Sequence, residues 1–445
     1  MTKKLSFFTF PYLFPVIFLI IYSFTRSWEF LCSSLVSFTL TSVCLMLLKS
    51  AHASHLFSLS KKASKLIFFV SFISCAFIFV LNLFSKSVNP YSLLVFLLSF
   101  LYFLFPDTLC VFSDLAYHNT LVNLKKNKIT INSEDALLDI KESKIIIIND
   151  FDKYQNPECV TSLAEKKLVI LTSQSSKEKL MLKYGEIFKK ASFAGSKITL
   201  PLPEKGIIIS NGDSEEVLRL VRLINMPYFA LDETVDIKEK DFSLIEKLCD
   251  TVDLMYAKYN KCLMYKMAIN LSLILSVFFL VFTCSLIPLN PLMLVFLCLI
   301  AEIPAGLSFV YGKTDLTHES KLKMLLDALL LSFTGFIVCM SGAISFSPPC
   351  ARLIFFNASV FSFLLYSFNL HSGKSIFLFD ILKKPGTIIS FFSGLLLSVL
   401  ISYLVYHEST AFGAKGWILI LTISLVPFCV IELQKAVTAL YKKSE

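Results

Sequence analysis

The stretch PYSLLVFLLSFLYFLFPDTLCVFS, residues 90–113, decides the fold class of this chain. It contains one charged side chain, Asp107, in 24 residues. A helix of about 20 apolar residues crosses the hydrocarbon core of a bilayer, so the stretch predicts a transmembrane helix. Pro106 interrupts the hydrogen-bond ladder of that helix directly before the carboxylate, because proline has no backbone N–H to donate.

Apolar segments of similar length occupy most of the chain. Of its 445 residues, 55% are hydrophobic and 17% are charged, whereas soluble domains have about 25% charged residues. We therefore predict an α-helical polytopic membrane protein with ten transmembrane helices and one small inserted α/β domain. The ten segments are residues 7–24, 28–48, 66–85, 90–113, 263–284, 290–311, 324–344, 351–370, 386–405 and 416–435.

This pattern divides the chain into three regions. Residues 1–113 hold the first four helices, residues 114–262 form the inserted domain, and residues 263–445 hold the last six helices. Lysines concentrate in alternate loops, and positively charged loops stay on the cytoplasmic side. We therefore expect a multi-pass protein of the plasma membrane, with the inserted domain and both termini in the cytoplasm. The same lysines account for the net charge of +9, so the expected partner is the lipid bilayer and not nucleic acid.

The inserted domain has the composition of a water-facing α/β fold. Continuous apolar runs at 145–148, 168–171 and 207–209 are typical of buried parallel strands. Functional side chains of such sheets lie at the carboxyl ends of the strands. Stretches of helix-forming composition alternate with the runs, at residues 157–166, 176–190 and 214–224.

Polar residues accompany each predicted strand. Asp150 and Asp152 follow the first strand, Thr172 follows the second, and Lys205 and Asp213 lie on either side of the third. Phosphoaspartyl chemistry needs an aspartate nucleophile, a second carboxylate as acid and base, and groups that hold phosphate and Mg²⁺. We expect Asp150 as the nucleophile, Asp152 as the acid and base, and Asp150 with Asp213 as Mg²⁺ ligands. The alternative is that all five are solvated turn residues of a scaffold.

The order of these residues resembles the haloacid-dehalogenase-type phosphotransfer core, and its place between four and six membrane helices resembles a P-type cation-transporting ATPase. Phe105-Pro106-Asp107-Thr108-Leu109 is similar to the family's Pro-Glu-Gly-Leu-Pro, and Leu124-Lys125-Lys126-Asn127 is similar to its Ala-Lys-Lys-Asn. The segment from Phe242 to Asn270 has the spacing of the family's path into the fifth helix. Glu302-Ile303-Pro304-Ala305 resembles its acidic Pro-Ala element.

Departures from the family pattern imply that ATP-driven pumping is lost. The family's Asp-Lys-Thr-Gly-Thr is replaced by Asp150-Phe151-Asp152-Lys153-Tyr154. About twenty residues separate Asp150 from Thr172, too few for a nucleotide-binding domain, and the loop at 49–65 is too short for an actuator domain. The resemblance therefore implies a degenerate member that does not bind ATP. Mg²⁺ is the cofactor expected for any phosphate chemistry that survives.

Three residues of the predicted helices form a candidate cation site. Asp107 follows Pro106 and Glu302 precedes Pro304, and the carbonyls that a proline leaves without a donor coordinate cations in membrane proteins. Together with Asn270 they offer the oxygen ligands that a hard cation prefers. Against the family pattern, Glu302 is shifted by about one position relative to its proline. The alternative is that Asp107 lies near a membrane face or pairs with a lysine, and that Asn270 bridges helices.

We expect a P-type-ATPase-like membrane protein that no longer pumps, and that binds or passes a cation or regulates a partner transporter. Two alternatives stay open. One is residual Mg²⁺-dependent phosphoaspartyl phosphotransfer or phosphatase activity, and the other is the membrane subunit of a split pump whose further domains come from separate chains. Near the end of the last segment, Glu432 and Lys435 are expected to face the cytoplasmic headgroups.

Overall fold

The chain forms two compact units in the computed structural model. The membrane unit comprises Met1–Ala51, Leu59–Leu115 and Ala257–Glu445, and the inserted unit comprises His52–Ser58 and Ala116–Tyr256. The structure describes residues 13–25, 28–49, 55–104, 107–127, 129–131, 136–142, 145–148, 156, 158–171, 192–193, 206–209, 235–237, 242–312, 314–316, 320–371, 373, 385–406 and 409–444.

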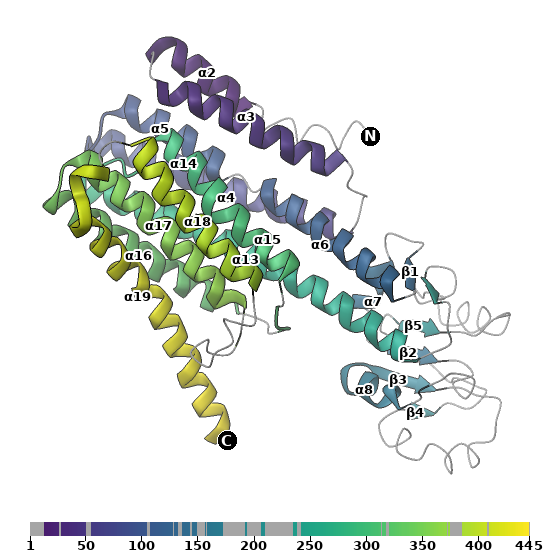
Figure 1. The fold of residues 1–445 in the computed structure, drawn as a ribbon. Coiled ribbons are helices and arrows are strands. Elements are labelled where there is room, and N and C mark those ends of the chain that lie inside the picture. The colour runs from purple at the N-terminus through teal and green to yellow at the C-terminus, as the bar shows by residue number, and fades with distance from the viewer. Residues whose placement is uncertain are drawn as a thin grey trace. The chain divides into compact units, whose positions relative to one another are not determined.

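The described part of the membrane unit is built from helices (Figure 1). Two of them, α6 and α13, also contribute residues to the inserted unit. In chain order the helices are α2 (Leu13–Thr25), α3 (Trp28–Lys49), α4 (His55–Ser85), α5 (Pro90–Leu104), α6 (Asp107–Lys126), α13 (Phe242–Cys284), α14 (Pro291–Leu297), the π-helical turn η3 (Cys298–Glu302), α15 (Ile303–Tyr311), α16 (Lys321–Ser345), α17 (Pro348–His371), α18 (Pro385–Leu404) and α19 (Ser409–Ser444).

The prediction of a multi-pass α-helical membrane protein is confirmed. Among the described residues, seven helical segments are long and apolar enough to cross a bilayer, and two shorter ones, Phe30–Ser42 and Ile388–Leu404, are also apolar. Each of the ten segments predicted from the sequence overlaps a helix. The seven long segments are Ser58–Ser85, Pro90–Lys126, Ser243–Cys284, Pro291–Tyr311, Lys321–Ser345, Pro348–His371 and Phe412–Leu440.

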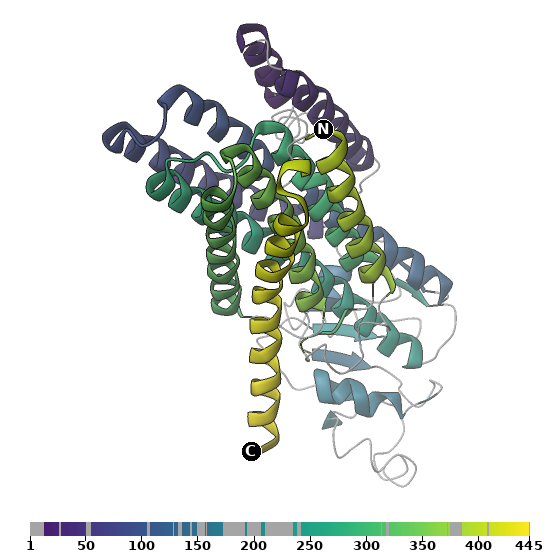
Figure 2. The same ribbon diagram turned by 60° about the vertical axis from the view of Figure 1, so that its left-hand side comes forward.

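Helix α17 forms the core of the C-terminal helices. It packs against α16, α18 and α19 (Figure 1), and its residues 353–371 are all buried. Small residues allow the close approach that membrane helices need: a Cβ atom added to Gly342 of α16 would lie 3.2 Å from Cα of Ala351. Figure 2 shows α19, in yellow, as a long helix that runs to the C-terminus.

The inserted unit contains a four-stranded parallel sheet and a two-stranded antiparallel one. The parallel strands follow the order β4-β3-β2-β5, and β1 pairs with β6. The three strands predicted from the sequence are therefore present and parallel. The strands are β1 (Ile129–Ile131), β2 (Ile145–Ile148), β3 (Leu168–Leu171), β4 (Ser192–Phe193), β5 (Gly206–Ile209) and β6 (Val235–Ile237), and the short helices are α7 (Ala136–Glu142) and α8 (Cys159–Lys166).

The helix predicted at 157–166 corresponds to α8. Its Val160 and Leu163 are buried, as expected for a helix that covers a sheet face. The helices predicted at 176–190 and 214–224 lie outside the described residues.

Candidate functional site

Two side chains of α13 hold the end of α5. Helix α5 ends at Leu104 and α6 begins at Asp107. The last carbonyls of a helix have no partner within that helix. Lys266 Nζ donates a hydrogen bond to the Phe103 carbonyl at 3.1 Å, and Asn270 Nδ2 donates one to the Leu104 carbonyl at 3.1 Å. One turn of α13 therefore satisfies two terminal carbonyls of α5.

The acidic partner comes from the π-helical turn η3. Pro304 follows this turn and has no N–H, so the Ile300 carbonyl cannot receive the usual bond from four residues later. π-Helical turns are commonly found inside helices at functional sites. Glu302 is the last residue of the turn, and 2% of its surface is exposed.

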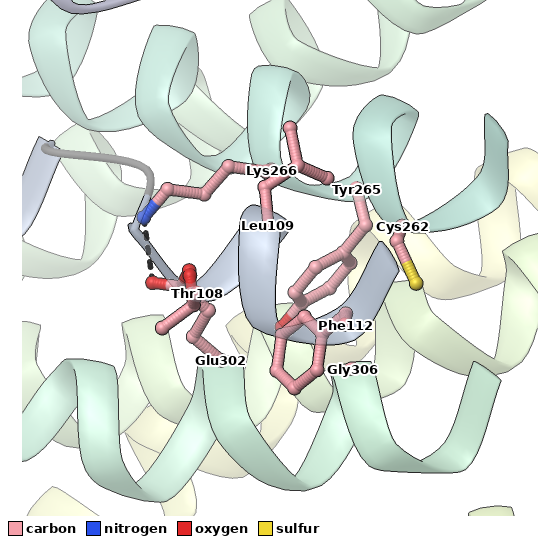
Figure 3. A pocket seen from close by; sticks show the side chains of 8 residues that line it. All are labelled: Thr108, Leu109, Phe112, Cys262, Tyr265, Lys266, Glu302 and Gly306. Carbon is pink, nitrogen blue, oxygen red and sulfur yellow. Dashed lines mark hydrogen bonds and ion pairs between the residues drawn. The ribbon is translucent and has the colours of Figure 1, made fainter. Parts of the chain in front are cut away.

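Lys266 and Glu302 form a buried ion pair (Figure 3). Nζ lies 2.6 Å from Oε2, and 3% and 2% of the two side chains are exposed. The Thr108 hydroxyl donates to Oε1, and Cys298 Sγ donates to Oε2 at 3.5 Å. A single charge at membrane depth is energetically unfavourable unless it is paired. Here each charge neutralises the other, and both carboxylate oxygens accept hydrogen bonds.

The Lys266 ammonium has the surroundings of a bound cation. Its ligands are the Glu302 carboxylate and the Phe103 carbonyl, and it lies 5.0 Å from the centroid of the Phe103 ring. Oxygen ligands and aromatic faces also hold free cations. The ammonium thus fills the position that the carboxylate and the end of α5 define.

Little space is left beside the ion pair. The cavity there has a volume of about 10 Å³, enough for about one water molecule. Tyr265 closes one side and donates its hydroxyl to the Ala301 carbonyl at 3.3 Å. A hydrated metal ion therefore does not fit next to Lys266. The cavity is lined by Thr108, Leu109, Phe112, Cys262, Tyr265, Lys266, Glu302 and Gly306 (Figure 3).

Two of the three residues predicted to bind a cation lie around this site. Glu302 is paired with Lys266, and Asn270 joins α13 to α5. Asn270 Oδ1 is buried and has no hydrogen-bond partner among the described residues. Asp107 is the first residue of α6, and its side chain lies outside the described part of the structure.

Sequence reasoning missed Lys266 and Thr108. Lys266 stands four residues before Asn270 in an apolar segment, and a lysine at membrane depth is by itself a signal of a site. Thr108 gave no comparable signal, because hydroxyl side chains are common in membrane helices, where they bond to the backbone of the same helix. Among the described residues, no group of three or more His, Cys, Asp and Glu side chains is placed to hold a metal ion.

The second set of predicted site residues lies at the strand ends of the inserted unit. β2 ends at Ile148 between β3 and β5, and all three strands are parallel. Their carboxyl ends therefore lie at the same edge of the sheet, which is the edge where such folds bind ligands. The predicted residues Asp150, Asp152, Thr172, Lys205 and Asp213 themselves lie outside the described residues.

Part of the membrane unit is similar to a known protein family. Residues 286–437 match the family model described as cation transporting ATPase, C-terminus. The matched region begins before α14 and extends into α19, so it contains η3 and Glu302. No curated protein matches the chain.

Proposed function

We propose that this P-type-ATPase-like membrane protein, whose residues 286–437 match the family model described as cation transporting ATPase, C-terminus, is a non-pumping relative whose cation position is filled by its own Lys266. The single observation that carries this proposal is the 2.6 Å contact between the Lys266 ammonium and the Glu302 carboxylate inside the membrane unit. The Lys266 ammonium is covalently attached to the chain. It cannot be released across the membrane as a transported ion is, so the site does not pass through a transport cycle.

The charge balance of the site supports this proposal. Lys266 carries one positive charge and Glu302 carries one negative charge, and both are almost completely buried. A second cation would leave an excess positive charge in a low-dielectric environment, which is strongly unfavourable. A free cation therefore binds only if Lys266 withdraws. The protein acts in this proposal as a pseudo-ATPase that gates a cation position or regulates a partner transporter.

Removal of the Lys266 ammonium tests the proposal. In Lys266→Met the stem keeps its volume and the charge is lost, so Glu302 and the Phe103 carbonyl should accept a free cation. We expect the purified variant in lipid nanodiscs to bind radioactive sodium or rubidium with saturation at one ion per chain, and the wild-type protein to bind none at this site.

Two further variants make that result specific. Lys258→Met is the matched control, because Lys258 lies in the same helix and donates to the Val310 carbonyl at 2.7 Å; this variant should not gain a bound ion. Adding Glu302→Gln to Lys266→Met should abolish the gained ion. Saturable binding by the wild-type protein that does not depend on Glu302 would contradict the proposal.

The strand order favours a second candidate function, residual phosphoaspartyl chemistry in a haloacid-dehalogenase-like unit. The strand that precedes Asp150 lies between the strands that precede Thr172 and Asp213, an order that would gather these residues around one phosphate and one Mg²⁺ ion. The test is Mg²⁺-dependent labelling by ATP, acetyl phosphate and inorganic phosphate. Label that is alkali-labile and absent in Asp150→Asn supports this function, and no label from any donor excludes it.

The proposal includes an orientation. Ten crossings would place the inserted unit and both termini on the cytoplasmic side of the plasma membrane, as the lysine-rich loops suggest. Single cysteines introduced in a cysteine-free background at residues 3 and 443 should react with an impermeant thiol reagent only after the membrane is opened. Reaction in intact cells would contradict this orientation.

A further inference from the structure

A second lysine of the membrane unit has the same kind of surroundings as Lys266. Lys435 Nζ donates to the Asn369 carbonyl at 2.6 Å and pairs with Glu432 Oε1 at 2.8 Å. The exposed fractions of the Lys435 and Glu432 side chains are 3% and 0%. The expectation that these side chains face the headgroups is therefore wrong: both are buried where α19 packs on α17.

Helix register explains why these groups meet. The Ser424 hydroxyl donates to the Ala358 carbonyl at 3.2 Å, and Lys435 donates to the Asn369 carbonyl. Both contacts join residues that are 66 positions apart, so α17 and α19 run parallel and keep one register over three turns. The interface between these two contacts is continuous.

The Asn369 side chain belongs to the same interface. Phe428 of α19 packs against the cluster that Leu365 and Phe368 of α17 form. Glu432 lies one helical turn beyond Phe428, and Asn369 lies one turn beyond Leu365. The amide of Asn369 is 1% exposed, and neither Oδ1 nor Nδ2 has a hydrogen-bond partner among the described residues. Buried amides are nearly always hydrogen-bonded to protein or to ordered water, so the Asn369 amide is open to a water molecule or an ion.

We propose that the Glu432 carboxylate and the Asn369 carbonyl form a second, peripheral cation site, which the Lys435 ammonium occupies in this conformation, and that the Asn369 amide oxygen becomes a further ligand when a free ion replaces the ammonium. Among the described residues, Glu432 is the one carboxylate paired with the ammonium, and a single positive charge balances it, so the site takes a monovalent cation. Divalent cations prefer sites with more oxygen ligands and more negative charge. The inference does not depend on the function proposed for Lys266.

A free cation can replace the Lys435 ammonium if the Lys435 side chain alone moves. Lys435 has a long flexible stem and lies near the end of the apolar segment Phe412–Leu440, from where a lysine extends its ammonium to the membrane surface. The Glu432 carboxylate is fully buried and stays behind. A monovalent cation that takes the place of the ammonium would keep that carboxylate neutralised.

Thermal unfolding of the full chain in lipid nanodiscs tests the site. Lys435→Met removes the competing ammonium and keeps the stem. We expect its unfolding midpoint to rise with KCl or NaCl to a plateau, and not with choline chloride at equal ionic strength. The half-saturating salt concentration should be at least about tenfold lower than for the wild-type protein, because apparent affinity falls with the fraction of sites that are open.

The matched control is Lys435→Met combined with Glu432→Gln, in which the ion-specific rise should disappear. An equal rise in both variants, or no rise in Lys435→Met, would overturn the site. If Lys435→Met does not fold, Glu432→Gln is compared with the wild-type protein. The rise of the wild-type unfolding midpoint at high KCl should be absent in Glu432→Gln. A rise that is retained in this variant overturns the proposal. Lys266 is intact in all these variants, so their outcome is independent of the first site.

Discussion

Lys266 of α13 and Glu302 of the π-helical turn are in direct contact, with Nζ 2.6 Å from Oε2 and both side chains at most 3% exposed. The contact joins a helix that the family match does not cover to a turn that it does cover. It also connects to α5 and α6, through the Phe103 carbonyl and the Thr108 hydroxyl. Four elements of the membrane unit, α5, α6, α13 and η3, thus meet at one neutral pair.

Removing either partner of this pair should strongly destabilise the membrane unit. Lys266→Met or Glu302→Gln leaves one buried charge without its counterion, which lowers the free energy of unfolding by about 3–5 kcal/mol. The double variant should lose less than the sum of the two single losses. The measurement is a double-mutant cycle: the unfolding free energies of the wild-type protein, the two single variants and the double variant are compared. Choline chloride is the salt, so that no small cation replaces the ammonium. Additive losses would show that the two charges are not coupled.

Gly306→Ala should destabilise the protein through overpacking of the cavity wall. A Cβ atom there would lie 2.0 Å from an atom of the Phe112 ring, so the ring or the helix must move, at a cost of about 1–3 kcal/mol. The matched control is Gly386→Ala in α18, where nothing lies within 4 Å of the added Cβ. The unfolding midpoint should fall in the first variant and not in the second. Equal midpoints would show that Phe112 is not packed on Gly306.

The contact between Asn357 and Ser402 should contribute a measurable coupling between α17 and α18. Asn357 Nδ2 donates to Ser402 Oγ at 2.8 Å, and Ser402 Oγ donates to Asn357 Oδ1 at 3.1 Å. Polar contacts between membrane helices couple by about 0.6 kcal/mol on average and at most about 1.7 kcal/mol. The unfolding free energies of Asn357→Ala, Ser402→Ala and the double variant give the coupling energy. A coupling energy of zero would show that the two hydrogen bonds between Asn357 and Ser402 do not stabilise the helix pair.

The stability contribution of Lys166 should disappear at high pH. The hydrogen bond to Asp250 raises the pKa of Lys166 above its ordinary value of 10.5, and burial acts in the opposite direction. Because the pKa is raised in the folded protein, the contribution is complete below the unfolded-state pKa and is lost as pH rises through the folded-state value. The Lys166 side chain is 42% exposed, so the contribution stays below about 1 kcal/mol.

The measurement for Lys166 is the difference in unfolding free energy between the wild-type protein and Lys166→Met as a function of pH. The difference should be constant at neutral pH and shrink above about pH 10.4. Asp250→Asn is the control, since it removes the largest cause of the raised pKa and should weaken the pH dependence of the remaining effect of Lys166→Met. A difference that increases with pH would contradict the direction of the pKa shift.

The architecture could be predicted largely from the sequence, because length and apolar composition determine a membrane helix with few other requirements. The strand Ile145–Ile148 was also predictable, because four consecutive β-branched residues favour a strand. Helix ends were harder to predict. The boundary between α5 and α6, for example, depends on carbonyls that α13 holds from 160 or more positions away.

The candidate site was only partly predictable, because its pairing depends on tertiary contacts. Glu302 was found through its carboxylate in an apolar segment, but nothing in its local sequence indicates that Lys266 is its counterion. Asn270 was predicted as a cation ligand, with helix bridging as the alternative; its Nδ2 bridges α13 and α5, while its Oδ1 is unpartnered among the described residues. The pattern of residues within one helix shows that a polar side chain is present. It does not show which side chain of another helix lies opposite it.

The π-helical turn Cys298–Glu302 determines which face of the following helix, α15, points toward its neighbours. A π-helical turn contains one residue more than an α-helical turn, and each residue advances an α-helix by about 100°. If one residue were deleted there, α15 would rotate by that angle, and the face that carries Gly306 would leave Phe112. A single surplus residue thus lets Glu302 point at Lys266 while the rest of the helix keeps its neighbours.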